Sequence, residues 1–418
     1  MLTFRFLHAA DIHLDSPLRG LRARSEEAAN QFAEASRKAF SNLVQAAIER
    51  NVAFVIIAGD LYDGDWKDYA TGQFFVREAA KLAREGIKLF LIRGNHDAAS
   101  DISRTLPPPD NMHEFDTRKV DSVEIAELSV ILHGRSFAQR HVADNMAGGF
   151  PAARPGWCNI GILHTSLTGR EGHDVYAPCS LDDLLRAGYQ YWALGHVHAR
   201  EVVHADPPVV FPGNLQGRHA REPGPKGATL VTVDNNVVAN LEALELDAAR
   251  WECPSVDITG LSDEASLHDA VRAAVAPLVG ACEGRPLALR LRLTGTTNLH
   301  ARLLAERERV AEDLQAIAST LSDQVWLEKL VVETRAPAVA GTLGLPLADL
   351  EEAFASAAAR PEFRRDLEAH LELIRSKAPR EALDAAALDI ETVLAQARDL
   401  IVSRLATGPG SPSEGGDR

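Results

Sequence analysis

Aspartate, asparagine and histidine side chains recur at short intervals in the first 200 residues of this 418-residue chain. Five groups carry them, each just after an apolar run: Asp11-x-His13, Gly59-Asp60, Gly94-Asn95-His96-Asp97, His164 and Gly195-His196-x-His198. Seven donors from five strand ends suffice for two divalent ions about 3.5–4 Å apart that share one carboxylate. Imidazole and carboxylate ligands without thiolate suit Mn, Fe or Zn, with Mg as a further candidate. Such an ion pair activates water for attack on phosphorus and neutralises the phosphate oxygens.

Each group alone has a simpler explanation. An Asp-x-His pair arises often by chance, Gly-Asp after a strand is commonly a turn, and a single histidine usually packs in a core. We keep that structural interpretation for four other histidines: His8, His133, His141 and His204. Five groups in succession, each closing a predicted strand, favour the metal site. His196 and His198 alternate along an extended segment, so both imidazoles are expected on the same side.

The elements that must position these groups alternate between strand and helix. The predicted elements are strands 4–8, 52–58 and 87–92 and helices 26–50 and 69–84. This order predicts βαβ units with parallel strands and right-handed crossovers. Because such strands gather their carboxyl ends at one edge of a sheet, Asp11, Asp60 and Asn95 are expected together there.

The second half of this region is predicted to be mostly strand. The further elements are strands at 128–133 and 158–163, a helix at 180–187, a strand from Tyr189, and short strands around Val202, Val209 and 228–233. Residues 134–157 are rich in Gly and Pro and lack periodicity. A loop of that length is often functional.

The composition changes near residue 250, which divides the chain. We predict a first domain over residues 1–250, an α+β cap domain over 251–337, a helical region over 346–406 and a disordered tail over 407–418. Twelve of the 15 histidines precede residue 250, which places the chemistry in the first domain. In the helical region, apolar residues from Leu383 to Leu405 approach a heptad stripe.

Charge and hydropathy exclude some classes of protein. The net charge of −15 argues against a sequence-independent DNA coat. No apolar run approaches the roughly 20 residues of a membrane helix, and the first residues do not resemble a signal peptide. The four cysteines form no CxxC pair, so we expect reduced thiols and a cytoplasmic location without membrane contact.

The motifs resemble those of a known family. The order D-x-H, GD, GNHD, H and GHxH is similar to the calcineurin-like metallophosphoesterase superfamily. Within it, ADIHLDSP, GDLYDG, RGNHD, GYQYWALGHVH and PGNLQGRH resemble the SbcD-type DNA repair exonucleases, and especially their YhaO-like branch. The resemblance covers about residues 1–235 by motif and the later domains by layout. It implies an α/β fold, a four-layer α/β/β/α sandwich with a small α+β cap domain and a helical C-terminal region, and two Mn ions.

The same resemblance implies a role for each site residue. Asp11, His13 and His198 would hold one ion, Asn95, His164 and His196 would hold the other, and Asp60 would bridge them. His96 would stabilise the transition state or protonate the leaving oxygen, with Asp97 orienting it. Some relatives carry a second catalytic histidine three residues after the bridging aspartate, where this chain has Asp63.

Partners are implied as well. DNA is the expected substrate, a coiled-coil, SMC-like ATPase the expected partner subunit, and a homodimer the expected assembly. The stripe from Leu383 to Leu405 is a candidate dock for the ATPase, and its packing on the chain's own cap domain is an equal alternative. Basic residues in predicted loops are candidate phosphate contacts, although a solvated surface position is the better interpretation of any one of them: Arg135, Arg140, Arg154, Arg170, Arg218, His219, Arg221 and Lys226.

Three functions remain open from the sequence. The first is a two-metal phosphodiesterase that hydrolyses DNA as the exonuclease subunit of a repair complex. The second is a phosphoesterase for small nucleotides or phosphoproteins, and the third is a non-catalytic scaffold of the same fold. The presence of every expected ligand argues against the scaffold.

Overall fold

The structure is a computed structural model in which two compact units are distinguished. It describes residues 2–16, 32–63, 69–99, 109–167, 176–337, 347–377 and 389–407. The first unit comprises Met1–Cys253, Val279–Leu289 and Gln324–Glu328, and the second comprises Pro254–Leu278, Arg290–Asp323 and Lys329–Arg418. Arg170, the predicted helix start at 26–31 and tail residues 408–418 lie outside the described residues.

The first unit contains two six-stranded sheets, and the first of these carries the N-terminal strand at its centre. Its strands, in spatial order, are β12 (Val237–Glu245), β11 (Gly227–Asp234), β1 (Thr3–Ala9), β2 (Phe54–Ala58), β3 (Lys88–Ile92) and β4 (Met112–Glu114). β1, β2, β3 and β4 are parallel, whereas β11 runs antiparallel to β1 and β12. The parallel part confirms the βαβ units predicted from the sequence.

The second sheet is built from later parts of the chain. Its strands, in spatial order, are β5 (Asp121–Ile125), β6 (Val130–Gly134), β7 (Cys158–His164), β8 (Tyr191–Gly195), β10 (Pro208–Phe211) and β9 (Glu201–Ala205). β6, β7, β8 and β10 are parallel, with antiparallel β5 and β9 at the edges. The sequence pattern does not predict β4, β5 or β12, because β4 has only three residues and the other two are edge strands with partly exposed faces.

Apolar side chains from both sheets pack against each other to form the central core. Phe6, Phe54 and Phe90 of the first sheet share one buried cluster with Ile160 and Tyr191 of the second. The ring centroids of Phe6 and Tyr191 lie 5.3 Å apart, edge to face. The two sheets therefore form a sandwich.

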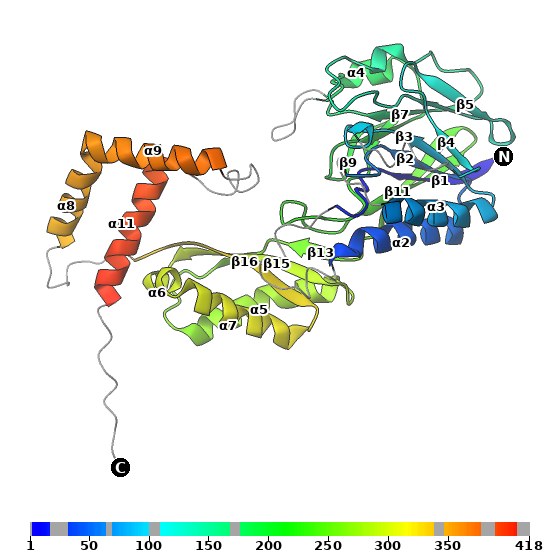
Figure 1. Ribbon diagram of the computed structural model, residues 1–418. Helices are drawn as coiled ribbons and strands as arrows, with labels where there is room; N and C mark the ends of the chain where they lie inside the picture. The colour runs from blue at the N-terminus through cyan, green and yellow to red at the C-terminus, as the bar shows by residue number, and fades with distance from the viewer. Residues whose placement is uncertain are drawn as a thin grey trace. The chain divides into compact units, whose positions relative to one another are not determined.

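Each outer face of the sandwich is also covered. Helices α2 (Ala35–Glu49) and α3 (Tyr69–Arg84) pack on the first sheet, where Phe40 and Phe75 join a buried cluster with Val55. Figure 1 shows these helices on one side of the sheets and the short helix α4 (Leu181–Leu185) on the other. The predicted loop at residues 134–157 also covers the second sheet, with Phe137 and Met146 in its outer core. The predicted α/β/β/α layering is confirmed.

His8 joins the two sheets through a buried polar contact. It lies in β1, and its ring nitrogens contact the Tyr191 hydroxyl at 2.9 Å and the Leu194 carbonyl at 3.1 Å. Burial lowers the pKa of His8 from 6.5 to about 3, so the ring is neutral. A neutral ring donates from Nε2 to Leu194 and accepts at Nδ1 from Tyr191.

The second unit begins with a small α+β arrangement. Its elements are β14 (Ser255–Asp257), α5 (Glu264–Ala281), β15 (Leu287–Thr296), α6 (His300–Ala305), α7 (Arg307–Leu321) and β16 (Val325–Arg335), some of whose residues belong to the first unit. β14 pairs in parallel with residues 292–294 of β15, and β16 also pairs with β15. In the first unit, β13 (Arg250–Glu252) pairs with Leu287–Leu289. Glu306 separates α6 from α7.

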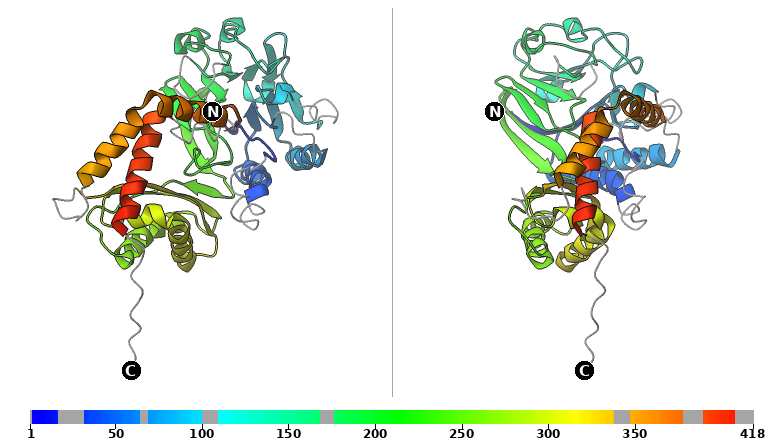
Figure 2. Two further views of the ribbon diagram at one scale, coloured as in Figure 1. Left: turned by 60° about the vertical axis from the view of Figure 1, so that its left-hand side comes forward. Right: turned by 90° about the vertical axis from the view of Figure 1, so that its left-hand side faces the viewer.

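Among the described residues, three further helices belong to the second unit. They are α8 (Leu347–Ala359), α9 (Pro361–Lys377) and α11 (Ile390–Thr407). α9 contacts both α8 and α11, and α11 also contacts α6, as Figure 2 shows. Among the described residues, no helix is long and apolar enough to span a membrane.

Candidate metal centre

The carboxyl ends of strands from both sheets converge at one place. In the first sheet, Ala58 at the end of β2 pairs with Ile92 at the end of β3. In the second sheet, His164 at the end of β7 pairs with Gly195 at the end of β8. The two ends meet at Gly195, where an added Cβ would lie 1.9 Å from the Ala58 carbonyl oxygen. Only glycine permits this approach, and it brings all five predicted groups together.

Several of the predicted ligands have an unusual backbone conformation. φ is positive at Asp11 (51°), His13 (46°), Asp60 (54°) and His196 (103°). Such a conformation costs about 1–3 kcal/mol per residue and persists only where the surroundings impose it. Here the Asp11 N–H donates to the Gly59 carbonyl and the His13 N–H donates to the Asp60 carbonyl, each at 3.0 Å. Strain concentrated at these residues is typical of a functional site.

Asp11, His13 and His198 form the first cluster of potential ligands, with one ligand atom from each within 4.8 Å of the others. His198 Nε2 lies 3.8 Å from Asp11 Oδ1. His13 is fully buried, and neither of its ring nitrogens has a hydrogen-bond partner among the described residues. A buried imidazole without a hydrogen bond is costly unless something else binds it. A metal ion at this cluster would satisfy His13.

Asp60 and His164 form a second cluster together with Asn95. His164 Nδ1 lies 3.0 Å from the Ala58 carbonyl, to which it donates. Its Nε2 then carries a lone pair, yet it faces Asn95 Oδ1 at 3.0 Å and Asp60 Oδ2 at 3.5 Å. A cation between these three atoms would satisfy the lone pairs that each of them offers. The donors therefore fit a divalent ion.

Asp60, a member of the second cluster, also faces the first cluster. Its Oδ2 is 3.8 Å from His13 Nε2 on one side and 3.5 Å from His164 Nε2 on the other. The side chain is buried, and its Oδ1 accepts a hydrogen bond of 2.9 Å from the His96 backbone N–H. This is the place that a bridging carboxylate requires.

Burial shifts the pKa values of the ligands in opposite directions. It raises the pKa of Asp11 well above the ordinary value, with the Asp60 charge adding to the effect, and it raises the pKa of Asp60. It lowers the pKa of His164 to about 3 and also lowers the pKa of His13 and His198. Neutral imidazoles thus lie beside carboxylates whose ionisation costs free energy. A bound cation would offset this cost, because its charge favours the ionised carboxylates.

His196 lies beside these clusters, although it belongs to neither cluster of His and Asp ligands. Its backbone N–H donates to Asp11 Oδ2 at 3.0 Å. Its ring centroid is 5.3 Å from that of His164 and 5.2 Å from that of Tyr176. The structure therefore brings all seven predicted ligands to one site.

His96 has a different carboxylate partner from the one expected. Its Nδ1 lies 2.8 Å from Asp63 Oδ1, and Asp63 Oδ2 accepts a hydrogen bond of 2.6 Å from Ser16 Oγ. Although burial alone would lower the pKa of His96, the Asp63 hydrogen bond and the nearby charges of Asp60 and Asp63 raise it. His96, His13 and Asp60 also form a cluster with ligand atoms within 4.8 Å.

The prediction that Asp97 orients His96 is corrected, because the Asp97 carboxylate binds backbone N–H groups instead. Its carboxylate accepts hydrogen bonds from the backbone N–H groups of Leu61 (3.2 Å), Tyr62 (2.9 Å) and Gly94 (3.1 Å). Burial and the Asp60 charge nevertheless raise its pKa to about 6. Asp97 therefore links the loop that carries Asp60 to the loop that carries Asn95 through hydrogen bonds.

Sequence reasoning missed Glu222, which contacts a predicted ligand. Glu222 Oε1 lies 2.6 Å from His198 Nδ1, and the residue is 6% exposed. It lies within the run PGNLQGRHARE, where a single acid follows several basic residues. That acid among basic residues is the one local signal that could have marked it.

The candidate DNA contacts have varied environments. Arg218 lies at the rim of the site with its side chain 19% exposed, and it pairs with Glu222 together with His219. Arg135 is half-buried, and its Nε has no hydrogen-bond partner among the described residues. Arg221 is exposed. Two of the candidates contact a predicted ligand: Arg218 Nη2 is 3.3 Å from His198 Nδ1, and Lys226 Nζ donates to the His198 carbonyl at 3.2 Å.

Comparison with known proteins identifies the class to which this fold and site belong. Residues 4–200 match the family described as calcineurin-like phosphoesterase. Its members are hydrolases that use divalent metal ions. Residues 251–335 match the middle domain of metallophosphoesterase YhaO.

Individual relatives give a narrower assignment. The chain is 32% identical over 342 residues to the uncharacterized metallophosphoesterase YhaO of Bacillus subtilis (strain 168). The matched residues cover 80% of this chain and 83% of that protein. The chain belongs to the YhaO family of calcineurin-like metallophosphoesterases.

Two more distant relatives are named for DNA double-strand break repair. The DNA double-strand break repair protein Mre11 of Sulfurisphaera tokodaii is 24% identical over 277 residues, or 62% of this chain and 67% of that protein. The protein of the same name from Methanopyrus kandleri is 26% identical over 302 residues, or 64% and 62% of the two chains.

Proposed function

We propose that this phosphoesterase is a two-metal phosphodiesterase that hydrolyses DNA, as the exonuclease subunit of a repair complex. The observation that carries the proposal is the position of Asp60, buried between an Asp11–His13–His198 cluster and His164. A pair of bound ions would supply an activated water and neutralise phosphate charge. Mn is the proposed metal because the family resemblance implies it, and the imidazole, carboxylate and amide donors suit Mn as well as Fe or Zn.

Each side chain of the site has a proposed role. Asp11, His13 and His198 would hold one ion, Asn95, His164 and His196 the other, and Asp60 would bridge them.

His96 remains outside both ligand sets. Asp63 holds Nδ1 of this ring at 2.8 Å, which leaves Nε2 for the substrate. From there His96 can stabilise the phosphate oxygens or give a proton to the leaving 3′ or 5′ oxygen.

DNA is proposed as the substrate on two grounds. Two relatives are named for DNA double-strand break repair. In addition, Arg218 at the rim of the site, with His219 and Arg221 in the same loop, offers donors for phosphate oxygens. Arg135 is proposed as a further contact, and Arg170 remains a prediction from the sequence.

The test is hydrolysis by the purified chain with Mn, Fe, Zn or Mg, with and without chelator. The substrates are linear duplex DNA, single-stranded DNA and a chromogenic phosphodiester. We expect Mn-dependent cleavage of all three. Chromogenic cleavage without DNA cleavage would favour a small nucleotide or phosphoprotein substrate, and no cleavage of any substrate would favour a scaffold.

Two variants make this assay specific. Asp60→Asn, prepared in the same way, should lose cleavage, which excludes a contaminating nuclease. His133→Asn removes another buried histidine, one that stacks on Tyr189 with ring centroids 4.7 Å apart. This control should retain metal-dependent cleavage, because His133 lies outside the site.

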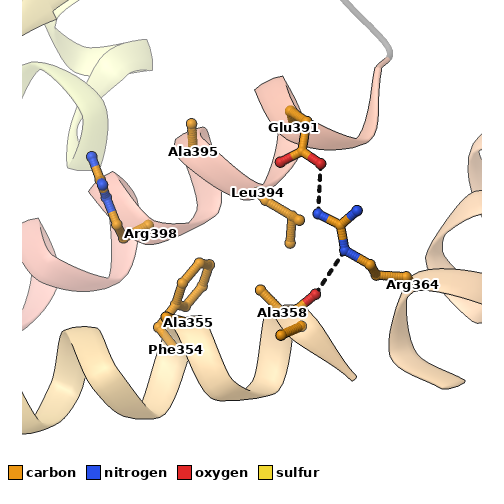
Figure 3. Close-up of a pocket in the computed structure, with 9 residues that line it drawn as sticks. Phe354, Ala355, Ala358, Arg364, Glu391, Leu394, Ala395 and Arg398 are labelled. Atoms are coloured by element: carbon orange, nitrogen blue, oxygen red, sulfur yellow. Dashed lines mark hydrogen bonds and ion pairs between the residues drawn. The ribbon is translucent and has the colours of Figure 1, made fainter. Parts of the chain in front are cut away.

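We also propose that the helical part of the second unit binds a coiled-coil, SMC-like ATPase. A groove of about 480 Å³ lies between α8 and α11. Figure 3 shows the residues that line it, with the ion pair between Arg364 and Glu391 at one end. Leu394, a member of the predicted apolar stripe, is buried in this groove at 7% exposure. Part of the stripe is thus already covered by its own unit, while Ile401 remains 41% exposed. Leu383 and Ala387 lie outside the described residues.

The exposed apolar residues of α9 offer a better dock. Phe363 and Ile374 are 45% and 49% exposed. They are 11 residues apart, which is about three helical turns, so they lie on the same face. Leu373 adds 52% exposure next to Ile374. Apolar residues at this helical spacing are the anchors that a partner helix uses.

Binding to the purified ATPase subunit tests this part of the proposal, with light scattering to determine the stoichiometry and the proposed homodimer. Phe363→Glu with Ile374→Glu should abolish binding while metal-dependent hydrolysis persists. Arg365→Glu, a charge reversal at an exposed position of the same helix, is the control. Unchanged ATPase binding after deletion of residues 346–418 would refute the dock.

A further inference from the structure

The loop that follows β10 encloses His198 from the side opposite the metal clusters. Glu222 is the centre of this loop, and its carboxylate is buried at 6% exposure. Five contacts converge on its two oxygens: His198 Nδ1 at 2.6 Å, Asn214 Nδ2 at 2.9 Å, the Arg218 backbone nitrogen at 2.8 Å, Arg218 Nη2 at 3.3 Å and His219 Nε2 at 3.5 Å. A buried carboxylate with this number of donors is fully satisfied and held in one orientation.

The contact with His198 determines how its ring is used. An ionised carboxylate only accepts hydrogen bonds, so His198 Nδ1 carries the proton and donates it to Glu222. The lone pair of the imidazole is then on Nε2, which lies 3.8 Å from Asp11 Oδ1. The backbone is fixed by the same loop, because Lys226 Nζ and the Asn214 N–H both donate to the His198 carbonyl, each at 3.2 Å.

Arg218 reaches the site through the same carboxylate. Its Nη2 is 3.3 Å from both His198 Nδ1 and Glu222 Oε1. Since Nδ1 already donates to Glu222, it cannot accept from Arg218, and the guanidinium is held by the carboxylate alone. The His198 imidazole thus separates the Arg218 guanidinium from Asp11. The Arg218 side chain is 19% exposed. It retains donors for a phosphate oxygen.

Asn214 connects this arrangement to the first strand. Its backbone forms a bridge with Ala10, the residue before Asp11, while its side chain donates to Glu222 Oε2. The Glu222 carboxylate therefore contacts His198 directly and is linked to the loop that carries Asp11 through Asn214.

We propose that Glu222 is the positioning residue of this site, which directs Nε2 of His198 to the metal and holds Arg218 for the substrate phosphate. The inference deepens the proposed function and rests on its metal centre. A carboxylate that orients a metal-bound histidine typically changes metal affinity 10- to 100-fold when it is removed. Glu222 differs from such a residue in also holding a cation toward the substrate, so its loss should affect two properties.

The first measurement is calorimetric titration of the full chain with Mn, without substrate. Glu222→Ala should weaken the binding of one of the two ions about 10- to 100-fold and leave the other nearly unchanged. Glu222→Gln keeps an acceptor for His198 but sets its amide against the Asn214 and Arg218 donors, so an intermediate loss is expected. It also keeps the volume of the side chain, and serves as the second variant if Glu222→Ala fails to fold.

Glu78→Gln is the matched control. Glu78 is an equally buried glutamate at 6% exposure, paired with Lys81 at 2.7 Å on helix α3. Its loss can lower stability, but both ions should bind as in the wild type. A folded Glu222 variant with wild-type affinity and stoichiometry for Mn would overturn the inference. A wild-type chain that binds no metal ion would overturn the proposed metal centre and this inference with it.

The second measurement separates metal binding from substrate binding. Arg218→Met should lower kcat/KM for the chromogenic phosphodiester about 10- to 100-fold, mainly through KM, with Mn affinity unchanged. Glu222→Ala should show both defects, and in its background Arg218→Met should add little. Full additivity of the two substitutions would refute the coupling through Glu222. Because both readouts avoid DNA, a failure of the DNA proposal would remain distinguishable from a failure of this one.

Discussion

Replacing Asp63 with asparagine tests how His96, the proposed catalytic histidine, is controlled. Asp63 Oδ1 lies 2.8 Å from His96 Nδ1, and Ser16 holds the other oxygen at 2.6 Å. Asp63→Asn keeps the size of the side chain but removes the charge that favours protonated His96. The side chains are 20% and 29% exposed, so solvent partly screens the contact. A hydrogen bond to a charged group contributes about 1.5–3 kcal/mol, and the screening favours the lower half of that range.

This free energy sets the expected size of the effect. About 1.5–2 kcal/mol corresponds to a loss of roughly 10- to 30-fold in kcat if the contact acts only in the transition state. The same contact predicts the direction in which the pH profile of kcat should move. Asp63 raises the pKa of His96, so its removal lowers that pKa and the acid form disappears at lower pH. The alkaline limb of the kcat profile should therefore move to lower pH.

The assay is steady-state hydrolysis of a chromogenic phosphodiester at saturating Mn between pH 6 and 10. Asp97→Asn is the control, because Asp97 binds the backbone of Leu61, Tyr62 and Gly94. It should lower the melting temperature, through a loss of about 1–3 kcal/mol, and leave the alkaline limb in place. If Asp97→Asn moved the limb and Asp63→Asn did not, the assignment of Asp63 would be wrong.

Three further predictions concern the metals and the core. Chelation should abolish hydrolysis and lower the melting temperature, because an ion present at 100 times its Kd stabilises the fold by about 2.7 kcal/mol; an unchanged melting temperature would contradict the ligand set. His8 has a folded pKa of about 3 against an ordinary 6.5, so its contribution to the free energy of unfolding is complete above pH 6.5 and falls by up to about 1.4 kcal/mol per pH unit below it. Denaturant titrations of metal-free wild type and His8→Gln between pH 7.5 and 5 should show a shallower slope in the variant. Gly195→Ala places a Cβ 1.9 Å from the Ala58 carbonyl and should cost at least about 1–3 kcal/mol and weaken Mn binding, whereas Gly280→Ala, where a Cβ meets nothing within 4 Å, should do neither.

The sandwich could be predicted from the sequence because its buried strands differ in pattern from its helices. The run from Val52 to Ala58 is wholly apolar, as a strand covered on both faces requires, and β2 occupies Phe54–Ala58. The helix expected over residues 69–84 has those bounds as α3. Three edge strands, β4, β5 and β12, escaped prediction because they are short or only partly buried. In β12, for example, exposed and half-buried residues are mixed over nine positions.

The location of the site was predictable for a related reason. Parallel strands carry whatever follows their last residue to one edge, so position along the chain translates directly into position in space. Asp11, Asp60, Asn95 and His164 each follow or end such a strand. The convergence of Asp11, Asp60 and Asn95 needed only the order of the strands in the first sheet, whereas His164 ends β7 of the second sheet and joins them because the two sheets pack together.

The contacts that tune the site could not be predicted in this way. Asp97 is adjacent to His96 in sequence, but the backbone turns after Asn95 and sends the Asp97 carboxylate to three N–H groups, while Asp63 approaches His96 from another loop. Glu222 contacts His198 across 24 residues. A ligand is marked by where its strand ends, whereas the residue that orients it can come from any loop that reaches the same place. In this chain, the strand ends therefore locate the candidate metal centre, and the loops around it supply the carboxylates that contact His96 and His198.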